Sequence, residues 1–353
     1  MSSMSPDLLE IAVSIGETLE NLDLSKGAYA GRSLGGGVFS RVNFAQVDFR
    51  GADLRETVFD QCDLRGAIVP NANLRRAVFN RCVLDHADLR ASNLHGAVFS
   101  ECDLVHAQLA QCTMSMAIVA KCKLDHAVLR GAQLDAALFS QSVLLDVCAD
   151  DTSWQYTALN ECDVSHLTWT GARMLRNVFF KTSLRGMSFA GTQLEGCQFS
   201  SADLSGADFS GVLLQQCNFQ GALLDGACFA KAVAPSTIFC EAGGKDVDFS
   251  QARLRQALFT GARFAGGNFA GCDLYQTHFA GAKLRGANFG GAELTYADFR
   301  HADLSRADLR GATMMRTVLH GSLTDEAQMG DCAGAIETDA DLAASERWQP
   351  LVA

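Results

Sequence analysis

The sequence lacks the features that would assign it to a membrane or to an oxidising compartment. It has no apolar run of roughly 18 residues, which excludes an ordinary transmembrane helix. Residues 1–23 contain neither a basic segment nor an unbroken apolar stretch, so no signal peptide is predicted. The 13 cysteines are an odd number without any C-x-x-C pair, which favours free thiols. We therefore expect a cytoplasmic protein, with signal-peptide-independent export as the alternative.

Motifs that carry common catalytic chemistry are also absent. There is no G-x-x-x-x-G-K-[ST] and no H-E-x-x-H. The abundant glycines follow a repeat instead of opening a phosphate-binding loop. The sequence therefore predicts no enzymatic activity and no cofactor.

The net charge of −11 is concentrated at the two ends of the chain. Residues 1–30 hold one Lys and five acids, a net of −4, and residues 321–353 hold one Arg and seven acids, a net of −6. The residues between them hold 27 basic and 28 acidic side chains, a net of −1. A continuous anionic surface is therefore not expected on the middle of the chain.

A large apolar residue recurs at every fifth position over most of the chain. Between Leu24 and Met329 the frame has 62 such positions and never shifts. Four of them lack a large apolar side chain: Ala149, Ala234, Gly244 and Thr324. Two positions earlier the residue is usually small, most often Ala, and one position earlier it is often Asp or Asn. A period of five fits neither a helix nor a strand, so the chain must turn a corner in every unit.

The unit A-(D/N)-(L/F)-x-x resembles that of the pentapeptide-repeat family, and the match covers about 306 of the 353 residues. The resemblance implies an all-β protein, a right-handed quadrilateral parallel β-helix with about 20 residues in each coil. It also implies that the central residue and the small residue two before it point inward, while the others point outward. The 62 units then predict a solenoid of about 15 coils.

The chain divides into three parts on this basis. Residues 1–22 are expected to form an N-terminal cap, residues 23–330 one solenoid, and residues 331–353 an acidic C-terminal cap with a short helix. Ser5 and Pro6 are typical of a helix start, and Thr338 or Asp339 is the expected N-cap of the second helix. Such caps would cover the ends of the core and the exposed strand edges.

Two inward columns follow from the frame. Thirteen successive positions from Phe179 to Phe299, ten residues apart, are all Phe, so we expect them to stack on two opposite walls. The second column lies two residues before the central position and consists of Cys62, Cys82, Cys102, Cys122 and Cys162. We interpret these cysteines as buried free thiols that replace Ala as small apolar residues.

An outward column of histidines lies on the other side of the same wall. It consists of His86, His106, His126 and, after Asp146, His166. The favoured interpretation is a solvated ladder produced by the repeat. The alternatives are a shared metal site or a stripe of imidazoles that titrates with pH.

Two interruptions of the frame stand out, near residues 145–170 and 231–246, and we expect local bulges or kinks there. The first combines acids with tryptophans, which favours a partner-binding patch on a regular scaffold. The residues of this candidate patch are Asp146, Asp150, Asp151, Trp154 and Trp169.

The functional prediction is a non-enzymatic protein-binding scaffold, because a regular solenoid offers long walls but no deep pocket. The resemblance adds two alternatives, a DNA-mimicking regulator of DNA gyrase of the quinolone-resistance type and a bacterial secretion-system effector or adaptor. The expected partner is another protein, without direct nucleic-acid or membrane binding. A homodimer formed through a terminal cap is a further open alternative.

Overall fold

The structure, a computed structural model, describes residues 4–338 and 340–347. The chain forms two compact units. The first comprises Met1–Met187 and Gly191–Gln193, and the second comprises Ser188–Ala190 and Leu194–Ala353. Among the described residues, no helix has the length and apolar character needed to cross a membrane.

Both units are built from the same β-turn, which sets the period of five. After Leu24, for example, the carbonyl oxygen of Leu24 accepts a hydrogen bond from the N–H of Gly27 at 3.2 Å. The third residue of this turn, Lys26, has φ 57°, in the left-handed region. A β-turn of type II requires a positive φ at this position, which Gly adopts without steric cost. The glycines of the repeat frame are therefore largely turn residues.

Successive coils are joined by parallel backbone pairing between residues 20 apart. The N–H of Asp48 donates to the carbonyl of Gly27 at 2.8 Å, and the N–H of Phe49 donates to that of Ile68 at 2.7 Å. Within each unit, such bonds join a coil to the coil before it and to the coil after it. This ladder satisfies the backbone polar groups that the narrow solenoid would otherwise leave unpaired.

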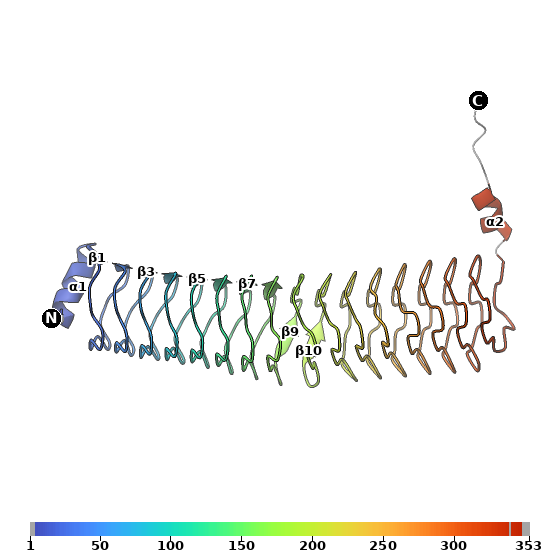
Figure 1. Cartoon of the computed structure of the whole chain (residues 1–353), viewed down its shortest axis with the longest axis horizontal. Coiled ribbons are helices and arrows are strands. Elements are labelled where there is room, and N and C mark those ends of the chain that lie inside the picture. The colour runs from blue at the N-terminus through green and yellow to red at the C-terminus, as the bar shows by residue number, and fades with distance from the viewer. Residues whose placement is uncertain (1–3, 339, 348–353) are drawn as a thin grey trace, which may run out of the picture. The chain divides into compact units, whose positions relative to one another are not determined.

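One wall of the first unit carries the only long sheet within the described residues, with eight parallel strands in chain order (Figure 1). Its strands are β1 (Thr18–Glu20), β2 (Val38–Ser40), β3 (Val58–Asp60), β4 (Val78–Asn80), β5 (Val98–Ser100), β6 (Ile118–Ala120), β7 (Leu138–Ser140) and β8 (Ala158–Asn160). The strands β9 (Arg173–Leu175) and β10 (Gln193–Glu195) form a separate two-stranded sheet.

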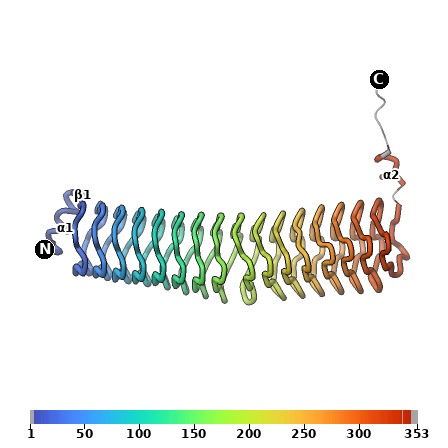
Figure 2. The backbone as a smooth tube through the Cα atoms, viewed as in Figure 1, coloured from blue at the N-terminus to red at the C-terminus, as the bar shows by residue number. Residues whose placement is uncertain are grey.

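The fold is the parallel β-solenoid that the repeat predicts, and the backbone of each unit winds in regular turns (Figure 2). The three-residue strands mark about 9 turns, fewer than the coils expected from the repeat count. The difference arises because many turns are joined by single bridging residues, such as Asn288 with Asp308, instead of by strands.

The N-terminal helix α1 (Pro6–Ser14) begins as the sequence predicts. Ser5 is its N-cap, and the Ser5 hydroxyl oxygen accepts a hydrogen bond from the N–H of Leu8 at 3.3 Å. The buried face of α1 consists of Leu9, Ala12 and Val13.

The C-terminal helix α2 (Ala340–Arg347) is also present where a short helix was expected. Of its two expected N-caps, Asp339 lies outside the described residues. The last two central positions of the repeat, Thr324 and Met329, are exposed. The described part of the C-terminal segment, residues 331–338 and 340–347, therefore does not cover these two side chains.

Phenylalanines form two stacks in the second unit, which confirms the predicted arrangement. Within one stack, the rings of Phe219 and Phe239 lie 5.0 Å apart at an interplanar angle of 6°. Across the interior, the rings of Phe229 and Phe239 meet edge to face at 5.5 Å and 87°. Parallel contacts along the stacks and perpendicular contacts between them are both favourable for aromatic rings.

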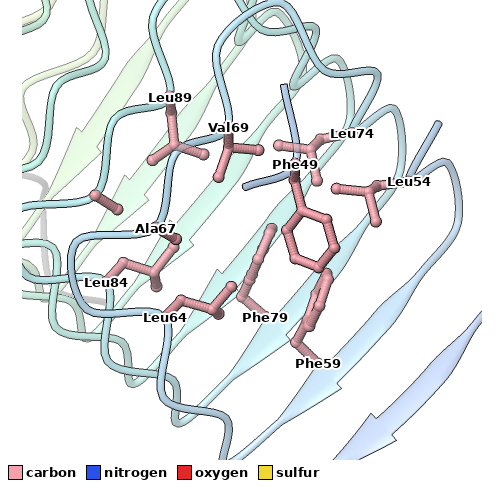
Figure 3. A pocket seen from close by; sticks show the side chains of 11 residues that line it. Phe49, Leu54, Phe59, Leu64, Ala67, Val69, Leu74, Phe79, Leu84 and Leu89 are labelled. Atoms are coloured by element: carbon pink, nitrogen blue, oxygen red, sulfur yellow. The ribbon is translucent and has the colours of Figure 1, made fainter. Parts of the chain in front are cut away.

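Phenylalanine and aliphatic side chains fill the part of the interior of the first unit that lies between Phe49 and Leu89 (Figure 3). The rings of Phe59 and Phe79 lie 4.9 Å apart and face Leu64 and Leu84 (Figure 3). Only about 10 Å³ of space remains among these side chains, roughly enough for one water molecule. This part of the core, between Phe49 and Leu89, has no room for a ligand.

All 13 cysteines are free thiols, and the five of the predicted column are buried. Their role differs from the apolar one that we expected. The sulfur of Cys122 accepts a hydrogen bond from the N–H of Cys102 at 3.4 Å and donates to the carbonyl of Phe99 at 3.5 Å. In the next coil Ser142 makes the same pair of contacts, accepting from the N–H of Cys122 and donating to the carbonyl of Val119. The Cys122 thiol thus bridges the N–H of Cys102 and the carbonyl of Phe99, which belong to one turn. In other turns, such as the one after Leu24, a direct hydrogen bond joins the equivalent two groups.

We predict that Phe239→Ala destabilises the coils around it by about 3–5 kcal/mol, because the ring is fully buried and touches four other phenylalanines. Hydrogen exchange of the amides in residues 219–259 measures this change. Phe180→Ala is the matched control, since Phe180 lies outside the frame and is 42% exposed. Equal effects of the two substitutions would contradict the prediction.

We also predict that Cys122→Ala accelerates exchange of the Cys102 amide and costs about 1–3 kcal/mol, because it leaves a buried N–H and a buried carbonyl without their bridge. Cys122→Ser should preserve both, since Ser142 already fills this role one coil later. Exchange rates in Cys122→Ala that equal those of the unsubstituted protein would show that the bridge is dispensable.

Candidate functional site

The histidine column faces outward from the first unit, as predicted. His86, His106 and His126 each occupy the left-handed turn position, with φ between 56° and 59°. The rings of His86 and His106 stack at 4.6 Å, and those of His106 and His126 stack at 5.1 Å. We call these three residues the histidine ladder. His166 is also exposed, but Asp146 stands between it and the ladder in the column.

Carboxylates flank the histidine ladder at both ends. Asp146 Oδ2 lies 3.9 Å from His126 Nδ1, and Asp85 Oδ1 lies 3.8 Å from His86 Nε2. The sequence analysis found only Asp146, because it compared residues at equivalent positions of successive coils. Asp85 lies at a different position, directly before His86 in the same turn. The ladder is therefore a strip of imidazoles with a carboxylate at each end.

The geometry of the histidine ladder favours a solvated stack over a shared metal ion. Nitrogen lone pairs lie in the plane of an imidazole ring, and metal ligation needs several of them to converge on one point. The interplanar angles of 23° and 16° make the ring planes nearly parallel instead. Parallel rings present a row of separate hydrogen-bonding groups.

The structure corrects the expected role of the two tryptophans in the partner-binding patch. Trp154 is 1% exposed and Trp169 is 3% exposed, so neither contacts a partner from the surface. Both occupy central positions of the repeat, which point inward. The indole N–H of Trp154 donates to the Thr152 hydroxyl, so its polar group is satisfied inside the core.

The three acids of the same patch have separate partners. Asp146 approaches the histidine ladder, while Asp150 Oδ1 accepts a hydrogen bond from the N–H of Thr170 at 2.9 Å. Asp151 Oδ2 lies 3.5 Å from Arg130 Nε. The acids therefore do not converge on one ligand.

Neither interruption of the repeat is the bulge that we expected, because the pairing between residues 20 apart continues through both, as between Cys148 and Thr168 and between Gly243 and Arg263. Near the first, Asp151 lies between Gly131 and Gly171 in an open hollow of about 390 Å³. Small residues in the adjacent coils leave this space.

The second interruption produces a similar hollow, of about 300 Å³. It lies where Gly243 and Gly244 lack side chains, and the cationic residues around it are Lys245, Arg263 and Lys283. The two hollows thus differ in the charge of their surroundings.

One further cluster was missed by sequence reasoning. His301, His320 and Glu346 bring their ligand atoms within 4.8 Å of one another. The two histidines lie in adjacent coils, and Glu346 belongs to α2. The repeat frame predicts that the two histidines lie side by side. No pattern in the sequence predicts that helix α2 approaches them.

Much of the surface acidity is neutralised locally. Six aspartates that precede a central residue are bound by the arginine two residues later: Asp48–Arg50, Asp53–Arg55, Asp63–Arg65, Asp88–Arg90, Asp298–Arg300 and Asp308–Arg310. Hydrogen bonds from Arg50 lower the pKa of the Asp48 carboxyl, and those from Arg310 lower the pKa of Asp308 to about 2.

Comparisons with known proteins agree with this repeat geometry. The description "Pentapeptide repeats (8 copies)" matches residues 102–141, 178–216, 192–230, 272–311 and 282–321. The description "Pentapeptide repeat region" matches residues 34–109 and 212–289. No curated protein sequence matches significantly.

Several solved structures are similar to the chain. HetL, a pentapeptide repeat protein involved in heterocyst differentiation regulation in the cyanobacterium Nostoc, is 19% identical over 94% of both chains, with a TM-score of 0.20. QnrB1, a plasmid-mediated fluoroquinolone resistance protein, is 19% identical over 60% of this chain and 88% of its own, with a TM-score of 0.30. A pentapeptide repeat protein of the Arabidopsis thaliana thylakoid lumen is 30% identical over 31% of this chain and 68% of its own, with a TM-score of 0.22. Together, the unbroken five-residue frame and the matches to both family descriptions show that the chain belongs to the pentapeptide-repeat family.

Proposed function

We propose that the protein is a non-enzymatic scaffold that binds another protein through the wall carrying the histidine ladder. The observation that carries the proposal is the outward row of three stacked imidazoles, of which only His106 is half-buried, with a carboxylate at each end. A partner that crosses several coils would meet hydrogen-bonding groups at a constant spacing. Repeat proteins use extended surfaces of this kind for recognition.

The filled interior supports binding over catalysis. Around Phe59 and Phe79, the space among the core side chains is about 10 Å³, and the hollow at Asp151 opens to the surface. Small-molecule sites are usually concave, largely apolar and several hundred Å³ in volume. The hollow at Asp151 is large enough for a small molecule, but it lies on a polar wall. We therefore assign it to the same protein-binding surface as Asp146.

The charge arrangement gives less support to the duplex-mimic alternative. Mimicry of DNA needs a row of uncompensated negative charges in place of the phosphates. Six aspartates of the walls instead share their charge with arginines through two-point contacts. An unchanged DNA gyrase supercoiling rate at excess protein would remove this alternative. The secretion-system alternative stays a prediction, which the genes adjoining the coding sequence would test.

The scaffold proposal predicts that replacing His86, His106 and His126 together with Ala abolishes capture of the partner, because the substitution removes every imidazole of the ladder. The measurement is quantitative mass spectrometry of proteins cross-linked to the purified chain in an extract of its source cells. We expect at least a tenfold loss of the specific partner.

The matched control for this experiment is the pair His95→Ala and His278→Ala, two histidines outside the ladder. Circular dichroism of both variants shows whether the solenoid is retained. If the ladder variant keeps every partner that the unsubstituted protein captures, the proposed binding wall is wrong.

The aspartate–arginine pairs predict a defined pH dependence. Arg310 holds Asp308 through contacts of 2.9 and 2.7 Å, and the folded-state pKa of Asp308 is lowered to about 2. Since the unfolded carboxyl titrates near pH 4, the pair stabilises the fold above that pH, and this contribution disappears as pH falls to about 2.

Arg310→Gln should therefore raise the pKa of the Asp308 carboxyl toward its ordinary value, measured by NMR titration. The stability difference between the two proteins should shrink between about pH 4 and pH 2. Arg50→Gln is the control, since it should move the titration of Asp48 and leave that of Asp308 unchanged. An unaltered Asp308 titration in Arg310→Gln would show that the arginine does not set it.

A further inference from the structure

Three metal-ligating side chains meet near the C-terminal end of the second unit. His301 Nε2 lies 2.9 Å from Glu346 Oε1, and His320 Nε2 lies 3.3 Å from Glu346 Oε2. Among residues 4–338 and 340–347, this is the only group of three His, Cys, Asp or Glu residues whose ligand atoms lie together in this way. The cluster is far along the chain from the histidine ladder and takes no part in the proposed binding wall.

The repeat geometry holds the two imidazoles in place. The N–H of His301 donates to the carbonyl of His320 at 3.0 Å, which ties their two coils together. His301 has φ 57° at a turn position, and the equivalent residue of the next coil is Gly321. A Cβ atom at position 321 would lie 2.5 Å from His301 Nδ1. The ring of His301 therefore occupies the space that the missing side chain leaves.

The spacing of the ligand atoms suits a small transition-metal ion. Zn²⁺ binds imidazole nitrogen and carboxylate oxygen at about 2.0–2.2 Å, so neighbouring ligands in a tetrahedral site lie roughly 3.3 Å apart. The distances of 2.9 and 3.3 Å from Glu346 to the histidines are close to this value. The three ligand atoms lie within 4.8 Å of one another, so a bound ion would draw them closer together.

We propose that His301, His320 and Glu346 form a binding site for a divalent transition metal, with Zn²⁺ as the best fit, and that the metal fastens helix α2 to the last coils. Two imidazoles and one carboxylate are a common ligand set for Zn²⁺, whereas Ca²⁺ and Mg²⁺ prefer oxygen ligands. Three protein ligands leave a fourth position for water.

Helix α2 has a physical need for such an attachment. A helix of eight residues is too short to be stable alone in water. Its described side chains include no buried residue, and Leu342 and Ala343 are only half-buried. Apolar packing therefore contributes little, and the contacts of Glu346 with the two histidines fix the helix to the solenoid.

The exposure of the two histidines is compatible with entry of a metal ion. His320 is buried, with 8% of its side chain exposed, while His301 is 52% exposed. One ligand is thus shielded, and the exposed side leaves a path for the ion to enter.

The test is titration of the metal-free full-length protein with Zn²⁺ by calorimetry, and with Co²⁺ by visible absorption. We expect one ion for each chain, with the absorption bands of a tetrahedral or five-coordinate Co²⁺ site. Glu346→Gln and His320→Gln should each weaken Zn²⁺ binding at least tenfold. Gly321→Ala should also weaken it, because the added methyl group displaces the ring of His301.

Two control variants distinguish this cluster from the remaining histidines of the chain. His95→Gln should bind Zn²⁺ as the unsubstituted protein does, and so should His106→Gln in the histidine ladder. A loss in His106→Gln would assign the ion to the ladder and overturn the proposal. Failure to bind one Zn²⁺, or unchanged binding in both Glu346→Gln and His320→Gln, would also overturn it and would leave a hydrogen-bonded cluster only.

Hydrogen exchange tests the fastening role independently of affinity. Saturating Zn²⁺ should slow exchange of the amides in Ala340–Arg347 at least tenfold in the unsubstituted protein and have no effect in Glu346→Gln. Binding of Zn²⁺ without any slowing in α2 would refute the role of the metal as a fastener. Unchanged partner capture in Glu346→Gln would separate this site from the proposed scaffold function.

Discussion

The structure depends on a β-turn whose third residue has a positive φ. This turn follows most central residues, and its repetition returns the chain to the same wall after 20 residues. Backbone hydrogen bonds then join equivalent residues of neighbouring coils. Because these bonds fix the register, each side chain has a defined direction, and equivalent side chains of successive coils lie directly above one another.

The register converts sequence columns into physical contacts. Inward phenylalanines become stacks that also meet edge to face, and outward histidines become a ladder with rings 4.6 and 5.1 Å apart. Cys122 lies where a turn lacks its direct backbone bond, and its sulfur atom bridges the two backbone groups. Binding residues are therefore expected at the outward positions and at the ends of the solenoid, because the side chains at inward positions pack in the core.

Sequence reasoning about individual residues succeeded where it followed the frame and failed where it did not. The frame correctly placed Cys102 inside and His106 outside. Trp154 and Trp169 were assigned to a surface patch although both occupy central, inward positions, and both are buried. At the two interruptions the pairing between coils continues, so the expected bulges do not form, and glycines beside the paired residues leave surface hollows.

The sequence by itself determined the fold, the direction of each side chain and the columns of Phe, Cys and His, because a five-residue period without a shift permits one register. Only the tertiary structure decided which side chains meet, whether within one turn or across different coils. The pairing of Asp85 with His86, the thiol bridge at Cys122 and the approach of Glu346 to His301 depend on side-chain rotamers and on the path of the terminal segment. The period of the repeat determines neither the rotamers nor this path. It specifies the solenoid, but not the course of the C-terminal segment that follows it.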